Sequence, residues 1–212
     1  MTSRCDMKFP TSTIAAVLAA LFLGAGCVSA PQTNTPSEEQ GRPITQKAYE
    51  ELIEKFSDGD TQYSGFYNNF EYKATLLNST VRTALLARQN EYYQWDREKW
   101  LSAKEKSDNE AAVETVVFLS FFTPERRNDN LADAKSIWRV YLDVGGRRYE
   151  GKVKKLRLLL AELQALYPYH TRWNTPYLVT FPVPTNAVEI QTSTLTVTGP
   201  LGSRTVEFPP VN

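Results

Sequence analysis

The chain has 212 residues, and its 24 lysine and arginine side chains balance 24 aspartate and glutamate side chains. This balance argues against a nucleic-acid-binding protein, which would carry a basic excess. Hydrophobic residues make up 42% of the chain and aromatic residues 12%, as expected of a folded domain rather than a disordered one. Only Cys5 and Cys27 contain thiols, so no disulfide can form after position 27 and the fold must depend on packing.

The N-terminal segment has the features of a secretory signal. Arg4 and Lys8 precede an uncharged apolar run of ten residues, Ile14–Leu23. A helix that crosses a bilayer needs about 20 apolar residues, so this run is too short for a permanent span. The sequence therefore predicts that the segment directs export.

Cys27 follows three small residues, Gly24-Ala25-Gly26. The sequence GAGC resembles the lipobox of bacterial lipoproteins, although Gly24 stands where leucine is usual. The resemblance implies that residues 1–26 are a lipoprotein signal peptide and that the Cys27 sulfur carries diacylglycerol, so that the protein is bound to the membrane through acyl chains such as palmitate. The alternative is an ordinary signal peptide that is cleaved at the alanine of VSA and releases a free protein.

Val28 occupies the position after the cysteine, where lipoproteins of the inner membrane often have aspartate. In a cell with two membranes, this resemblance implies anchoring to the outer membrane, facing the periplasm. Residues 27–43 contain Pro31, Pro36 and Pro43 and few apolar side chains, which indicates a flexible tether. Residues 44–212 are long enough for one globular domain.

The first half of this domain shows helical and strand patterns in turn. Tyr49–Phe56 has apolar residues at helical spacing and is followed by Ser57–Asp60, which predicts a turn. Alternation at Phe70–Leu76 predicts a strand that starts near Phe66. Ser79 to Lys106 lacks glycine and proline and has a wide apolar arc, so we predict one helix of about 25 residues.

The second half is mainly strand-like. Thr115–Phe122 is apolar on both faces, as in a central strand. Gly145-Gly146 predicts a tight hairpin between Ile137–Val144 and Arg147–Val153. The remaining predictions are a helix with leucines from Leu156 to Leu166 and the strands Tyr177–Val183, Thr194–Thr198 and Thr205–Phe208.

Together these elements predict a mainly β, α+β domain with an N-terminal helix and one long helix. Their order is similar to that of the immunoglobulin-like modules found on envelope lipoproteins. The resemblance implies a β-sandwich and brings no active site with it.

The residues that could carry chemistry are few. His170 is the single histidine, so a transition-metal site is not expected, and no nucleotide-binding motif is present. Asp58-Gly59-Asp60 is similar to the start of a calcium loop, but Tyr63 and Asn69 stand where that loop needs glycine and glutamate, which favours a plain turn. We predict no metal and no cofactor.

Two loops combine the residue types that are common in protein interfaces. We predict an interaction surface from eight residues: Arg126, Arg127, Asn128, Asp129, Tyr169, His170, Arg172 and Trp173. The alternative is structural, with the aromatic side chains closing one end of the domain and the arginines paired with nearby carboxylates.

Three functions remain open from the sequence. The first is a non-catalytic outer-membrane lipoprotein that binds an envelope protein or has a structural role. The second is an envelope hydrolase acting on glycan or peptide. It would use either His170 in a serine triad or a pair of carboxylates, for which the candidates are Glu114, Asp143, Glu150 and Glu189. The third is a carrier of a small ligand, which would need a deep apolar pocket.

Overall fold

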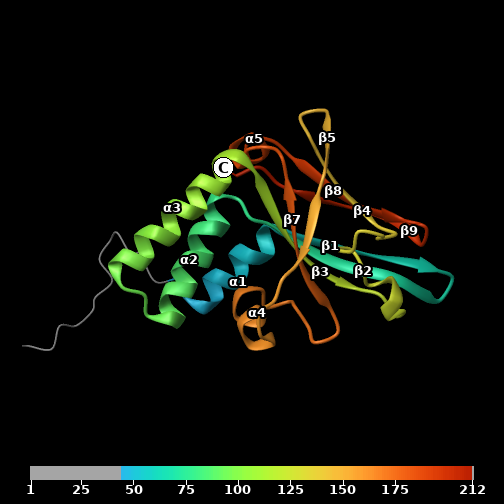
Figure 1. The fold of residues 1–212 in the computed structure, drawn as a ribbon, viewed down its shortest axis with the longest axis horizontal. Coiled ribbons are helices and arrows are strands. Elements are labelled where there is room, and N and C mark those ends of the chain that lie inside the picture. Colours follow the sequence, from blue (N-terminus) through green and yellow to red (C-terminus); the bar gives the residue numbers. More distant parts are fainter. Residues whose placement is uncertain (1–43, 212) are drawn as a thin grey trace, which may run out of the picture. The chain divides into compact units, whose positions relative to one another are not determined.

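The computed structural model describes residues 44–211, so residues 1–43, including the signal peptide, Cys27 and the tether, lie outside the described residues. Figure 1 shows the elements as a ribbon. Their bounds are α1 (Gln46–Lys55), β1 (Ser57–Ser64), β2 (Tyr67–Leu76), α2 (Ser79–Tyr93), α3 (Arg97–Val113), β3 (Thr115–Phe122), a short 3₁₀ turn (Arg126–Asn128), β4 (Arg139–Val144), β5 (Arg147–Glu150), β6 (Lys152–Lys155), α4 (Leu160–Leu166), β7 (Thr175–Phe181), α5 (Thr185–Glu189), β8 (Ser193–Gly199) and β9 (Gly202–Phe208).

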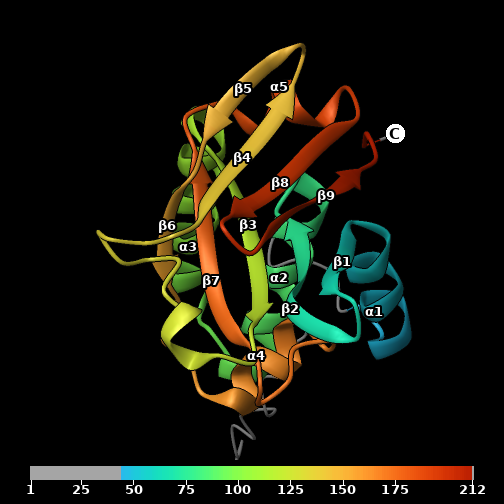
Figure 2. The same ribbon diagram turned by 90° about the vertical axis from the view of Figure 1, so that its right-hand side faces the viewer.

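The strands form two antiparallel sheets. The first sheet has the order β1-β2-β3-β7-β6, and the second has the order β5-β4-β8-β9. In Figure 2, β4 and β8 of the second sheet cross in front of β3 and β7 of the first. The predicted α+β class is therefore confirmed, as is the hairpin at Gly145-Gly146, which joins β4 to β5.

One hydrophobic core receives side chains from both sheets, and we call it the inter-sheet core. Along β4 and β8 the buried residues alternate with more exposed ones, as a strand with one buried face requires. The Phe70 ring of β2 meets the Trp138 ring edge to face, with 4.8 Å between the ring centroids. The core includes Phe70, Tyr72, Val117, Leu119, Phe121, Trp138, Val140, Leu142, Tyr177, Val179, Phe181, Leu195, Val197, Val206 and Phe208.

A second core, the helix-side core, lies between the opposite face of the first sheet and the helices, which gather on one side of the strands in Figure 1. Val116 and Phe118 of β3 point into it, whereas Val117 and Leu119 point into the inter-sheet core. The prediction that Thr115–Phe122 is a strand buried on both faces is confirmed. The helices contribute Tyr49, Ile53, Phe56, Leu77, Val81, Ala84, Leu85, Leu163, Leu166 and Tyr167 with their flanking residues.

The prediction of one long helix from Ser79 to Lys106 is wrong. The chain forms α2 and α3 instead, and Gln94 between them adopts a left-handed conformation with φ 47°. Asp96 then starts α3 by accepting a hydrogen bond from the Lys99 backbone N–H at 2.7 Å. The left-handed residue Gln94 therefore ends α2, and the capping side chain of Asp96 begins α3, in a segment that contains no glycine or proline.

Two further predictions near turns are also wrong. Ser57–Asp60 is the start of β1, which pairs with β2 from Ser57 opposite Thr75 to Ser64 opposite Tyr67. The return strand Arg147–Val153 is divided at Gly151, so that β5 belongs to the second sheet and β6 to the first. A Cβ atom on Gly151 would lie 2.4 Å from Val179 Cγ1, so the crossing between the sheets requires glycine.

Smaller differences concern the helices near the C-terminus. The leucine-rich helix begins only at Leu160, and residues 156–159 precede it in a non-helical conformation. Helix α5 was not predicted. None of the helices between residues 44 and 211 has the length and apolar content that crossing a bilayer requires.

Candidate functional site

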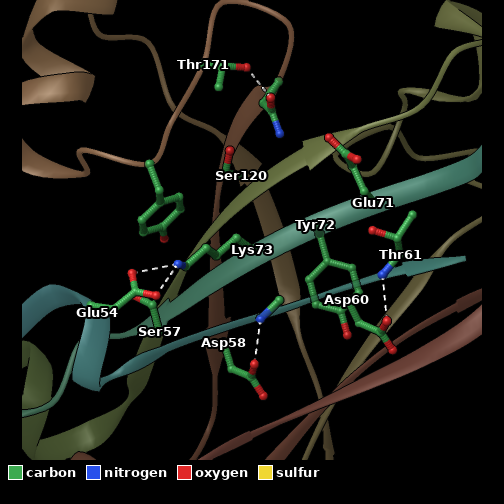
Figure 3. Close-up of a pocket in the computed structure, with 13 residues that line it drawn as sticks. Glu54, Ser57, Asp58, Asp60, Thr61, Glu71, Tyr72, Lys73, Ser120 and Thr171 are labelled. Atoms are coloured by element: carbon green, nitrogen blue, oxygen red, sulfur yellow. Dashed lines mark hydrogen bonds and ion pairs between the residues drawn. The ribbon is translucent and has the colours of Figure 1, made fainter.

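A polar groove of about 450 Å³ lies on the face of the first sheet that carries the helices (Figure 3). It crosses β1, β2 and β3, and the chain between α4 and β7 contributes to its lining. The lining residues are Glu54, Ser57, Asp58, Gly59, Asp60, Thr61, Glu71, Tyr72, Lys73, Ser120, Tyr169, Thr171 and Asn174.

At one end of the groove, Lys73 of β2 forms an ion pair with Glu54, which lies near the end of α1. Lys73 Nζ is 2.8 Å and 2.6 Å from the two carboxylate oxygens of Glu54. The same Nζ lies 4.9 Å from the centre of the Tyr169 ring, which is within the range of a cation–π contact. The cation is therefore held between a carboxylate and an aromatic face.

A series of hydroxyl groups links this end to the sheet. Tyr169 Oη and Thr75 Oγ1 are 2.5 Å apart, and Thr75 Oγ1 is 2.6 Å from Ser57 Oγ. Ser57 in turn donates to the Ile53 carbonyl at 2.6 Å. Burial raises the pKa of Tyr169, so its hydroxyl stays protonated at neutral pH. The series is neutral and is satisfied by bonds within the protein.

Asp58 and Asp60 of β1, beside the groove, face the second sheet and join it to the first. Asp58 accepts hydrogen bonds from the backbone N–H groups of Gly59, at 2.8 Å, and of Glu207 in β9, at 3.1 Å. Asp60 lies 3.5 Å from Arg204 Nε, and the Thr61 N–H donates to it at 2.7 Å. In the described part of the chain, no group of three or more histidine, cysteine or acidic side chains could hold a metal ion.

Ser120 and His170 form a pair at the floor of the groove. Ser120 Oγ and His170 Nδ1 are 2.8 Å apart, and this is the one hydrogen bond that the ring makes among residues 44–211. The His170 ring also packs edge to face on Phe118, with 5.9 Å between the ring centroids. His170 is 2% exposed, and burial lowers its pKa, so the ring is neutral at pH 7.

The first predicted loop does not line the groove. The side chains of Arg126 and Arg127 are exposed, and Arg127 pairs with Glu125 at 2.7 Å. The Asn128 carbonyl accepts a hydrogen bond from Trp138 Nε1 at 2.6 Å. Asp129 accepts hydrogen bonds from Tyr177 Oη, at 2.8 Å, and from Thr175 Oγ1. Asn128 and Asp129 therefore connect this loop to the body of the fold.

The second predicted loop contributes to the groove directly. Tyr169 lines it and His170 supports its floor, together with Thr171 and Asn174, which were not predicted. Arg172 is exposed, and Trp173 is 63% exposed. The structure thus brings half of this loop to the groove and leaves Arg172 and Trp173 on the surface.

A group of exposed aromatic residues was missed in the sequence. Tyr63, Phe66 and Tyr67 lie at the turn that joins β1 to β2, and we call this group the aromatic tip. Their exposures are 54%, 108% and 51%, and Gly65 between them has φ +60°. The hairpin points away from the helices in Figure 1. The signal in the sequence is YSGFY, in which the turn residues Ser64 and Gly65 stand between aromatic residues, but the alternation further along predicts only a strand that starts near Phe66.

This chain matches no protein-family model, and no curated protein or solved structure shows significant similarity to it.

The buried His170 predicts a specific pH dependence of stability. Its pKa in the fold is below the ordinary 6.5, so the unfolded state takes up a proton that the folded state resists. The stability that neutral His170 contributes is present above about pH 6.5 and is lost as the pH falls below that value. His170→Asn keeps a hydrogen-bonding side chain but cannot titrate, so its destabilisation should be largest at pH 7.5 and should shrink towards pH 5.

The measurement is the midpoint of thermal unfolding of both proteins across this pH range. Gln164→Ala is the matched control, because it removes only a bond to the His170 carbonyl, at 3.2 Å, and its effect should be the same at each pH. A destabilisation by His170→Asn that does not change with pH would show that His170 does not titrate as its burial requires.

Proposed function

We propose that this protein is an outer-membrane lipoprotein, anchored through Cys27 and facing the periplasm, whose domain binds another protein of the envelope and catalyses no reaction. The GAGC sequence supports the anchor, and residues 28–43 would act as the tether. The exposed aromatic tip is the observation that supports protein binding by the domain.

We further infer that the two sheets form a β-sandwich of the immunoglobulin-like kind. The support is the inter-sheet core, to which β2, β3 and β7 of one sheet and β4, β8 and β9 of the other contribute buried side chains. The helices on the outer face of the first sheet would then be an addition to such a module. In this arrangement the loops and hairpins at the ends of the strands are available for binding.

The aromatic tip has the composition of a protein-binding surface. Tyr and Phe are enriched in interfaces because they bury a large area at low cost in side-chain entropy. Three such side chains within five residues are at least half exposed, and the strand before them is polar. Grouped aromatic surface of this kind is uncommon on a monomer unless a partner covers it. The balanced charge of the chain favours contact through apolar and hydrogen-bonding groups rather than ion pairs.

The anchor is tested by Cys27→Ser. Without the sulfur, no thioether to diacylglycerol can form, so we expect complete loss of labelling by a radioactive or alkyne-tagged fatty acid and accumulation of the longer precursor. The measurement is gel mobility and label incorporation in growing cells. Cys5→Ser is the control and should leave both unchanged. If the Cys27→Ser protein were still labelled, the lipobox assignment would be wrong.

Partner binding is tested by a photo-crosslinking amino acid at position 66. In intact cells we expect a reproducible protein adduct when the crosslinker replaces Phe66, and at least a fivefold lower yield, on the order of one hot-spot contact, when Tyr63 and Tyr67 are both changed to Ser. The crosslinker at Asn109, exposed on α3, is the matched control. No adduct in any growth condition, or the same adduct from both positions, would contradict the proposal.

A second candidate function, an envelope hydrolase acting on glycan or peptide, is favoured by one observation. Ser120 and His170 have the contact that joins a nucleophile to a general base, and Ser120 lines the polar groove. Against it, Ser120 is 1% exposed and the base has a lowered pKa.

The hydrolase candidate makes a clear prediction. The purified full chain should hydrolyse cell-wall fragments or ester substrates, and Ser120→Ala should abolish the activity, because no nucleophile remains. Arg127→Ala changes an exposed residue outside the groove and is the control, which should retain the activity. Inactivity of the unmodified chain on both substrate classes would remove this candidate and leave the lipoprotein proposal unaffected.

A further inference from the structure

A second cavity, of about 400 Å³, lies between α2, α3 and residues 156–158, and we call it the helical cleft. It exists because the chain reverses at Gln94 and runs α3 back beside α2. Residues 156–159 add a wall because they are not helical before α4 begins. The volume falls in the range of about 300–1,000 Å³ that is usual for sites of small organic ligands.

The wall of the helical cleft is mainly apolar. It is lined by Leu85, Leu86, Trp95, Leu156, Leu158 and Leu178 among others. Leu158 and its neighbour Leu159 are 38% and 73% exposed, so apolar surface continues from the cleft to the outside of the protein. This surface would stabilise a hydrocarbon chain by removing it from water.

Arg82 supplies a buried cation in this wall. It is 8% exposed, and its Nε donates to the Leu77 carbonyl at 2.9 Å. Its Nη1 lies 3.5 Å from the Ser107 carbonyl and 3.7 Å from a carboxylate oxygen of Glu110. Within residues 44–211, Nη2 has no hydrogen-bond partner. A buried donor without an acceptor is costly, so the guanidinium is suited to an incoming anion.

The charges around the cleft favour an anion as well. Besides Arg82, the lining contains Lys99 and Lys106, and Glu110 is its one acidic residue among those described. The chain as a whole carries equal numbers of acidic and basic side chains, so this excess of positive charge is local. Because Nε and Nη1 already face acceptors within the protein, Nη2 is the group that can donate a charged hydrogen bond to a carboxylate.

We propose that the helical cleft binds a single-chain anionic amphiphile, represented by a long-chain fatty acid, with its carboxylate on Arg82 and its acyl chain against Leu85, Trp95 and Leu158. This adds a ligand to the proposed lipoprotein and does not depend on its anchor or its aromatic tip. The polar groove is a different site, because its charged and hydroxyl groups bond to each other and to the backbone.

The experiment uses the full chain purified from membranes and placed in nanodiscs of phosphatidylcholine. The probe is palmitic acid carrying a diazirine and an alkyne, and the control probe is its methyl ester. After irradiation, the adducts are mapped by mass spectrometry of the digested protein. We expect the acid to label peptides within residues 77–110 and 154–160 about tenfold more than the ester does, which corresponds to one charged hydrogen bond.

Two variants and one control make the result decisive. Arg82→Gln should lower labelling by the acid about tenfold and leave labelling by the ester unchanged. Ala103→Trp, which fills the cleft from α3, should abolish labelling by both probes. Arg127→Gln removes an exposed arginine that does not line the cleft and should change nothing.

Equal labelling by acid and ester would overturn the proposal, and so would adducts spread along the chain or adducts that persist in Ala103→Trp. Thermal unfolding of each variant shows whether it is folded. If Arg82→Gln does not fold, Ala103→Trp decides: loss of the adducts supports the cleft, and their persistence overturns it. These outcomes are separate from those at Cys27 and Phe66, so either proposal can fail alone.

Discussion

The structure depends on the burial of β3 on both of its faces. Val117, Leu119 and Phe121 point into the core between the sheets, and Val116 and Phe118 point into the core beneath the helices. A strand without an exposed face must have covering layers on both sides, because each uncovered side chain of this size would lose about 1.5–3 kcal/mol of hydrophobic stabilisation. The second sheet covers one face, and α1, α2 and α4 cover the other.

The same strand also places the polar groove. Ser120 continues the row of Val116 and Phe118 on the helix-side face, at the point where the helical cover ends. Ser120 is itself only 1% exposed, so its hydroxyl needs a partner within the protein, and His170 provides that partner. The groove is therefore the uncovered remainder of a face whose other part is a hydrophobic core.

The two cavities differ in how their charges are satisfied. In the polar groove, Lys73 is neutralised by Glu54, and Asp60 by Arg204. In the helical cleft, the Arg82 guanidinium is more buried than any of these groups, yet its closest carboxylate oxygen is 3.7 Å away. The helical cleft, with an incompletely paired cation beside apolar walls, is therefore better suited to bind an amphiphile. The polar groove is less suited, because its charged groups already bind each other.

Local patterns in the sequence were sufficient to predict several features of the fold. The apolar run Thr115–Phe122, the alternation around Val140 and Leu195, and the glycine pair at Gly145 each determine a strand or a hairpin within a few residues. The GAGC sequence likewise carries the lipoprotein prediction without reference to any fold. Features of this kind depend on periodicity or on the conformation of single residues, which the chain specifies locally.

Only the tertiary structure decided the rest. The polar segment Ser57–Ser64 is a strand because β2 pairs with it, and Asp58 and Asp60 serve to join β1 to β9. His170 and Arg82 are buried and Asp129 is half-buried by residues that are distant in the chain, so none of their environments follows from their neighbours in sequence. Backbone pairing and burial are long-range properties, and a pattern that reports only local preference cannot specify them.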